Sequence, residues 1–122
     1  MKIVVCHPKH FDYNLELYQP LRDSMLDSEH EILLPHDPPE KDIKTKDEIE
    51  AADLVVAEVS LPGTGLGMEL GWADAAGKPV ACFYRSGSQV SSSLKYISKN
   101  LIEYSDSKDF IEKLTAYLAN KS

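Results

Sequence analysis

The residues best suited to chemistry lie in a glycine-rich segment, Ser60 to Gly71 (SLPGTGLGMELG), which follows a strongly apolar run. Glycines let backbone N–H groups approach a ligand closely, and a helix N-terminus favours anions. Glu69 is predicted to lie in the first turn of the helix that this segment enters, where the helix dipole would keep its carboxylate ionised. An ionised carboxylate can act as a nucleophile, and attack on an anomeric carbon would form a covalent glycosyl-enzyme. Stabilisation of the helix dipole alone is an equally good interpretation of Glu69.

Further groups near this segment could hold an anionic ligand. His7 and Lys9 follow the first apolar run, and their side chains could supply positive charge to a phosphate. A polar loop at this place is as often only solvated surface. The candidate backbone donors within the segment belong to Gly63, Thr64, Gly65 and Gly67.

Several common site types do not fit these residues. The glycine spacing does not match G-x-G-x-x-G, and no P-loop lysine follows, which argues against a dinucleotide site and a P-loop. His30 and His36 have no metal-ligand spacing with His7 or His10, so no metal is expected. No acidic pair follows the first predicted strand, which argues against a receiver domain.

Composition and net charge limit the classes of molecule that the protein is expected to bind. The 122 residues carry a formal net charge of -7, which argues against a nucleic-acid backbone or an anionic membrane as the main partner. A small phosphorylated ligand remains compatible with this charge. Cys6 and Cys82 each lie in an apolar run and are expected to be reduced thiols in the core. With a strand pattern from Lys2 onward and no apolar stretch of about 20 residues, no signal peptide or membrane span is expected, and the protein is expected in the cytoplasm.

The predicted elements alternate between strand and helix. Strands are predicted at residues 3–6, 31–34, 53–60, 80–84 and 101–104. Helices are predicted at residues 14–27, 45–52, 67–76 and 107–119, with a kink or restart at Pro20 and a C-terminal stop at Gly77. Residues 35–39 are predicted to form a rigid proline-rich loop.

This alternation predicts a single α/β domain over residues 1–122. We expect a flavodoxin-like (Rossmann-like) three-layer sandwich with a five-stranded parallel sheet in the order 2-1-3-4-5. In such a sheet, ligands bind beyond the carboxyl ends of strands one and three, where the strand order reverses. Those ends are the loops after Cys6 and after Val59.

The chain resembles the nucleoside 2-deoxyribosyltransferase superfamily, most closely its 2′-deoxynucleoside 5′-phosphate N-hydrolase branch. The resemblance rests on residues 52–59 (ADLVVAEV), Pro62, residues 67–71 (GMELG) and residues 77–80 (GKPV). It implies a flavodoxin-like fold, a homodimer, no metal or organic cofactor, and chemistry at the N-glycosidic bond. The glutamate of the Gly-x-Glu-Leu-Gly motif, the implied nucleophile, maps onto Glu69.

Outside these motifs the chain departs from the family pattern. Val4 stands where the family commonly has an aromatic residue. Tyr13 is a candidate to replace it, but packing at the start of the helix is the better interpretation of Tyr13. Thr45 stands where relatives have a catalytic aspartate. Asp47, two residues later, is a candidate to substitute for it, although its helical phase differs by about 200°. The loop His7-Pro8-Lys9-His10 replaces a Gly-Ser-Ile-Arg-like phosphate loop. Ser91, Ser92 and Ser93 occupy the region where the resemblance implies a serine that binds phosphate across the dimer interface. Polar loop residues without such a role are an equally good interpretation.

Two functions are compatible with these observations. The first is cleavage or transfer at the N-glycosidic bond of a (deoxy)nucleoside or nucleoside 5′-monophosphate, with Glu69 as nucleophile. The second is a catalytically silent nucleotide-binding or sensing module of the same fold. The intact residues 67–71 favour the enzyme, whereas Val4 and Thr45 favour the silent module. Trp72 is expected in the core or at a dimer interface, and Glu58, at the end of a buried strand, is expected to have a partner or a site.

Overall fold

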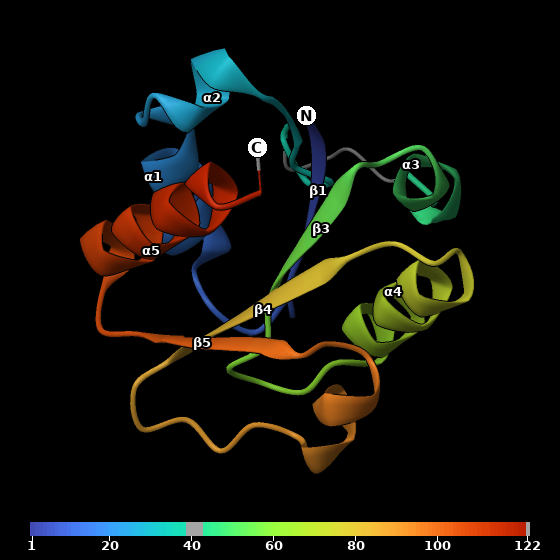
Figure 1. Cartoon of the computed structure of the whole chain (residues 1–122). Coiled ribbons are helices and arrows are strands. Elements are labelled where there is room, and N and C mark those ends of the chain that lie inside the picture. The colour runs from blue at the N-terminus through green and yellow to red at the C-terminus, as the bar shows by residue number, and fades with distance from the viewer. Residues whose placement is uncertain (39–42, 122) are drawn as a thin grey trace.

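A computed structural model describes residues 1–38 and 43–121. Within these residues, five parallel strands form one sheet in the order β2-β1-β3-β4-β5 (Figure 1). The predicted flavodoxin-like order is therefore confirmed. The strands are β1 (Lys2–Cys6), β2 (Glu31–Leu33), β3 (Leu54–Glu58), β4 (Val80–Arg85) and β5 (Asn100–Tyr104).

Helices cover both faces of this sheet (Figure 1). One face carries η1 (Asn14–Tyr18), α1 (Gln19–Arg22), α2 (Leu26–Glu29) and α5 (Ser107–Ala119). The other carries α3 (Lys46–Glu50), α4 (Thr64–Ala75) and the short 3₁₀ helix η2 (Ser92–Tyr96). Successive residues of a strand point to opposite faces, so Ile3 and Val5 join the first core cluster, while Val4 and Cys6 join the second. Both faces of β1 are thus buried, as a central parallel strand requires.

The segment predicted as one helix at residues 14–27 consists of three short pieces. The π-helical turn η1 is followed directly by α1, and α2 starts only at Leu26. Pro20 lies in the first turn of α1, and the backbone is already helical at Tyr18 before it. The predicted restart at Pro20 is therefore wrong, because the interruption follows Arg22. The predicted alternative, a kink at Pro20, stays a prediction. The predicted proline-rich loop is described only as far as Pro38, and Pro39 lies outside the described residues.

Helix α4 begins three residues earlier than the sequence predicts. It starts at Thr64, after Gly63 in an extended conformation, so Gly65 and Gly67 are helical. Burial of Leu66, Leu70 and Ala73 along one face compensates for the low helix propensity of the glycines. Glu69 therefore lies in the second turn of α4, and its predicted place in the first turn is wrong. Gly77 ends the helix with a φ of 70°, as predicted.

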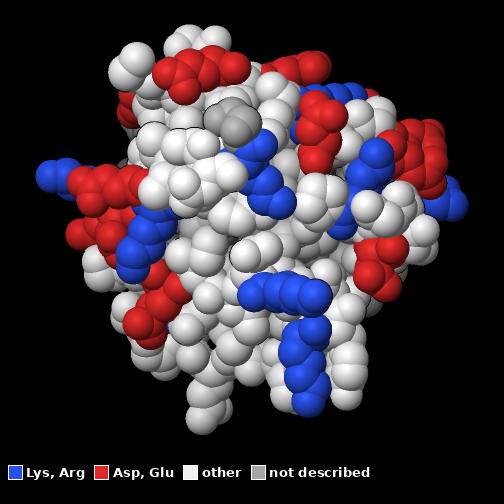
Figure 2. Space-filling model, viewed as in Figure 1, with Lys and Arg blue, Asp and Glu red and all other residues white. Residues whose placement is uncertain are grey.

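The surface carries charges of both signs. Lysine and arginine side chains are interspersed with aspartate and glutamate over the face shown in Figure 2. None of the helices within residues 1–38 and 43–121 is long and apolar enough to cross a membrane.

Candidate active site

Glu69 lines a cavity of about 260 Å³ at the carboxyl edge of the sheet. Its walls come from the end of β1, the loops after β1 and β2, the segment before α3, and α4. Of the two loops at which the fold predicts a ligand, the loop after β1 lines this cavity, whereas the loop after β3 lines a second cavity described below. The loops after β1 and β2 share this edge because β1 and β2 are parallel neighbours.

The Glu69 carboxylate is half-buried and held by neutral donors. The Thr45 hydroxyl donates to Glu69 Oε2 at 2.7 Å. Burial raises the pKa of Glu69 above its ordinary value, while hydrogen bonds from Thr45 and Cys6 and the charges of His36 and Lys9 oppose that rise. The ionisation of Glu69 is therefore determined by desolvation and local hydrogen bonds, and not by the helix dipole as the sequence suggested.

Thr45 occupies the N-cap position of α3, yet its side chain does not cap the helix. Its hydroxyl points instead to Glu69, and Thr45 itself is only 7% exposed. Asp47, the candidate substitute for the missing aspartate, is exposed in the first turn of α3 and does not line the cavity. Of these two residues, Thr45 and not Asp47 contacts Glu69.

His7 lies in the wall of the cavity, but it is not the cation that the sequence suggested. Burial lowers the pKa of His7 to about 4, so its imidazole is neutral at neutral pH. Both ring nitrogens are also occupied, since Nδ1 lies 2.8 Å from Pro8 O and Nε2 lies 2.6 Å from the Tyr18 hydroxyl. His7 is therefore a structural part of the wall.

Positive charge at the cavity comes from Lys9 and Lys44. Both side chains are exposed, and neither forms a salt bridge with a described residue. His36 lines the same cavity, and its ring nitrogens make no hydrogen bond within residues 1–38 and 43–121. Sequence reasoning missed Lys44 and His36. The predicted strand order contained the signal for His36, because the end of β2 lies beside that of β1.

Comparison with known proteins adds independent information. Residues 5–112 match the sequence profile of the family described as nucleoside 2-deoxyribosyltransferase. A Thermofilum pendens protein, provisionally named 2′-deoxynucleoside 5′-phosphate N-hydrolase 1, is 35% identical over 101 residues, which cover 79% of this chain and 68% of that protein.

This chain belongs to the nucleoside 2-deoxyribosyltransferase family.

One further relative and one solved structure differ in how much of this chain they cover. The 5-hydroxymethyl-dUMP N-hydrolase of Rattus norvegicus is 54% identical over 37 residues, which are 30% of this chain and 23% of the rat enzyme. The chain thus aligns with less than a quarter of that enzyme's length. The structure of the Clostridium botulinum CMP N-glycosidase BcmB superposes with a TM-score of 0.65 at 20% identity, covering 94% of this chain and 99% of that one. This superposition shows a shared fold.

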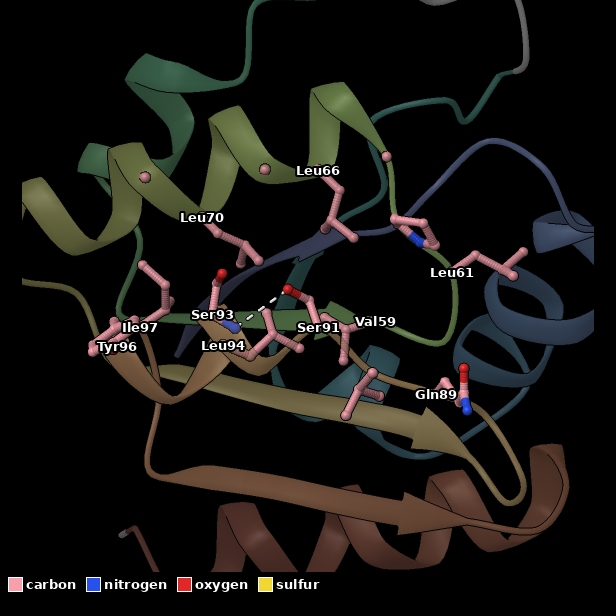
Figure 3. Close-up of a pocket in the computed structure, with 15 residues that line it drawn as sticks. Val59, Leu61, Leu66, Leu70, Gln89, Ser91, Ser93, Leu94, Tyr96 and Ile97 are labelled. Atoms are coloured by element: carbon pink, nitrogen blue, oxygen red, sulfur yellow. Dashed lines mark hydrogen bonds between the residues drawn. The ribbon is translucent and has the colours of Figure 1, made fainter.

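The remaining substrate-binding residues predicted from the sequence lie at two different cavities or at neither. Gly65 lines the Glu69 cavity. Gly63, Gly67, Ser91 and Ser93 line a second, apolar cavity of about 650 Å³ between α4 and the segment 89–97. In Figure 3, Leu66 and Leu70 point from α4 toward Ser91, Ser93 and Leu94, and the Ser93 N–H donates to Ser91 Oγ at 3.3 Å. Thr64 and Ser92 are exposed and line neither of these two cavities.

The second cavity lies on the opposite side of α4 from the Glu69 cavity, since Leu66 and Leu70 line it whereas Glu69 lines the first. Its serines therefore do not face Glu69 of the same chain. We call it the α4 groove. Trp72, also on α4, is partly buried, packs against the second core cluster and lines the Glu69 cavity.

Glu58, at the end of β3, has partners of its own. It is 3% exposed and accepts hydrogen bonds from the Ser60 N–H at 2.6 Å, the Ser60 hydroxyl at 3.0 Å and the Tyr104 hydroxyl. Glu58 therefore anchors the start of the loop that leads to α4. Among the described residues, no group of three His, Cys, Asp or Glu side chains is placed to hold a metal ion.

Proposed function

We propose that this protein cleaves the N-glycosidic bond of a nucleoside 5′-monophosphate, with Glu69 as the nucleophile. The observation that carries the proposal is the Glu69 carboxylate, held by Thr45 at 2.7 Å, in a cavity at the carboxyl edge of the sheet with Lys9 and Lys44. Relatives that are named as N-hydrolases support the class of reaction.

In the first step, Glu69 attacks C1′ of the sugar. A C–O bond forms between the carboxylate and C1′, and the C1′–N bond breaks with its electron pair going to the base. The departing base takes up one proton. His36 lines the cavity, and its ring nitrogens make no hydrogen bond with any residue that the structure describes. Imidazole is the group used most often for such transfers. The products are the free base and a glycosyl ester on Glu69.

In the second step, water attacks C1′ and releases Glu69 as a carboxylate. One water proton remains on the new sugar hydroxyl, and the other returns to the group that protonated the base. The sum is one water consumed, one base released and one sugar phosphate released. If a second base replaced water, the same ester would lead to transfer instead of hydrolysis.

The phosphate would lie against Lys9 and Lys44. A monophosphate carries nearly two negative charges, and the protein itself has a net charge of -7. Binding therefore requires local donors that outweigh the repulsion at long range. Two exposed lysines without a salt-bridge partner in the described chain, at the rim of the Glu69 cavity, provide such donors.

A catalytically silent nucleotide-binding module is the alternative. Thr45 favours it, because the family resemblance predicts an aspartate at this position, and a threonine cannot carry its charge. The alternative predicts tight binding of nucleotides with no bond cleavage. It shares the cavity and the lysines with the first proposal and differs only in the chemical step.

We also propose a homodimer. Ser91 and Ser93 lie in the α4 groove, on the other side of α4 from Glu69. They could approach a Glu69 cavity only if they came from a second copy of the chain. A second copy would also cover the apolar side chains of the groove, including the 76% exposed Tyr96.

A substrate panel tests the proposed function. The protein is incubated with pyrimidine and purine nucleosides and their 5′-monophosphates, in ribose and 2′-deoxyribose forms, and free base is separated by chromatography. Release of a base from at least one monophosphate is expected. Binding of monophosphates without release of base would favour the silent module, and neither binding nor release would contradict both functions.

A further inference from the structure

The Tyr18 hydroxyl connects two loops that form walls of the Glu69 cavity. Tyr18 ends η1 and is 3% exposed. Its hydroxyl oxygen lies 2.6 Å from His7 Nε2, in the loop after β1. The same oxygen accepts a hydrogen bond of 3.1 Å from the backbone N–H of His36, in the loop after β2. These loops carry Lys9 and His36 to the cavity.

The surroundings of His7 define where its proton lies. His7 Nδ1 is 2.8 Å from the carbonyl oxygen of Pro8, and a carbonyl can only accept, so Nδ1 carries the hydrogen. In a neutral imidazole, Nε2 is then an acceptor, and the Tyr18 hydroxyl donates to it. The hydrogen bonds thus run from the His36 N–H to Tyr18, from Tyr18 to His7, and from His7 to Pro8.

Aromatic rings pack around these hydrogen bonds, but their contacts do not fix the loops in the same way. The His7 ring packs against Tyr13 with centroids 4.5 Å apart, and Tyr13 packs against Tyr18 at 5.0 Å. Such contacts are apolar and tolerate sliding, whereas a hydrogen bond between buried groups fixes both distance and direction. Leu17 and Tyr18, the last two residues of the π-helical turn η1, are both buried.

We propose that Tyr18 is a positioning residue for the binding site: its hydroxyl fixes the loops after β1 and β2 relative to each other and thereby places Lys9 and His36 in the wall of the same cavity. The nature of the ligand rests on the proposed function, but the connection between the loops does not. Tyr18 itself does not line the cavity and touches no substrate in this proposal.

Tyr18→Phe and Tyr13→Phe form a matched pair for a test. Each removes one hydroxyl from the same aromatic cluster, but the Tyr13 hydroxyl makes no hydrogen bond within the described residues. The first readout is the ¹⁵N spectrum of the His7 imidazole and of the backbone amides at residues 7–10 and 35–38, without any ligand. The second is the Kd of 2′-deoxyuridine 5′-monophosphate by calorimetry, with Glu69→Gln in every variant to prevent turnover.

In Tyr18→Phe, we expect the single Nδ1–H form of His7 to give way to exchange between forms, and the amides of both loops to shift. The Kd should rise about tenfold, the size expected when a buried hydrogen bond is lost. Tyr13→Phe should leave both readouts unchanged. Equal effects of the two variants, or altered spectra with an unaltered Kd, would overturn the proposal.

His7→Phe provides a second variant in case Tyr18→Phe does not fold. It keeps a ring in place but removes both nitrogens, so it should shift the amides of the loop after β1 and raise the Kd in the same way. Unshifted amides would overturn the proposal. If the Glu69→Gln parent binds no nucleotide, the proposed function fails, while the ligand-free spectra still decide whether Tyr18 connects the loops.

Discussion

Thr45 donates a hydrogen bond of 2.7 Å to Glu69 Oε2 and so connects the start of α3 to the second turn of α4. The hydroxyl is used for this contact although Thr45 stands at the N-cap of α3, where it could have capped the helix at a gain of about 1 kcal/mol. The Thr45 hydroxyl donates to a carboxylate in a cavity instead of capping its own helix. A functional role of the Glu69 carboxylate explains this choice of partner.

Thr45→Val should shift the pH dependence of base release. The hydroxyl stabilises the ionised carboxylate, so its loss should raise the pKa of Glu69 further above the ordinary value. Because the nucleophile must be ionised, kcat/KM should start to fall at a higher pH as the solution is acidified. Thr45→Ser keeps the hydroxyl and should retain the wild-type profile. Identical profiles for Thr45→Val and wild type would contradict this role.

His7 should make the fold less stable at acid pH. Its pKa in the folded protein is about 4, against an ordinary value of 6.5, so the unfolded chain binds the extra proton between these values. The free energy of unfolding should therefore fall as the pH is lowered through this window, by about 2 kcal/mol between about pH 7.5 and about pH 5.

Urea unfolding of wild type and His7→Phe at the two pH values measures this contribution. His7→Phe should be less stable overall, because two hydrogen bonds are lost, but its stability should fall less on acidification. An equal fall in both proteins would show that His7 is not the group responsible.

Lys9→Ala and Lys44→Ala should each weaken the binding of a monophosphate. The expected loss is about 1–3 kcal/mol for a charge-assisted hydrogen bond, and the affinity for the nucleoside should change little. Added salt should reduce the wild-type preference for the monophosphate. Lys108→Ala, on α5 at the opposite face of the sheet, removes the same charge away from the cavity and serves as control. If wild type bound nucleoside and monophosphate with equal affinity, the proposal that these lysines bind the phosphate would be wrong.

The fold was largely predictable from the sequence because its signals are local. Short apolar runs separated by helical stretches predict parallel strands, and β1, β3 and β4 follow that pattern. The start of α4 was not predictable in the same way, since Gly63, Gly65 and Gly67 resemble a loop. Burial of Leu66, Leu70 and Ala73 along one face compensates for the low helix propensity of these glycines.

The site was predictable only where the family motif marks it. Glu69 is marked by the Gly-x-Glu-Leu-Gly pattern, but its partners come from distant segments. Thr45 and Lys44 lie before α3, in a loop without a chemical signature, and their approach to Glu69 depends on how α3 packs on α4. The neutral state of His7 also depends on its burial, which the sequence of the loop after β1 does not reveal.

Sedimentation should show twice the mass of one chain at micromolar concentration. Gly71→Lys should reduce the mass to that of one chain, because Gly71 lines the α4 groove and a lysine there would oppose a second copy. A Cβ at Gly71 meets no atom within 4 Å in the same chain, so the variant should fold and melt near the wild-type temperature. A monomeric wild type would contradict both the interface and a serine donated across it.

The release of free base by wild type and by Glu69→Gln, compared on one confirmed monophosphate, tests the central claim most directly. The amide is nearly isosteric with the carboxylate but is a poor nucleophile, so the variant should keep its circular dichroism spectrum and still bind the nucleotide. We expect wild type to release base and the variant to lose at least about a thousandfold in rate, the scale on which essential catalytic groups act. Base release by Glu69→Gln at a rate near that of wild type would contradict Glu69 as the nucleophile.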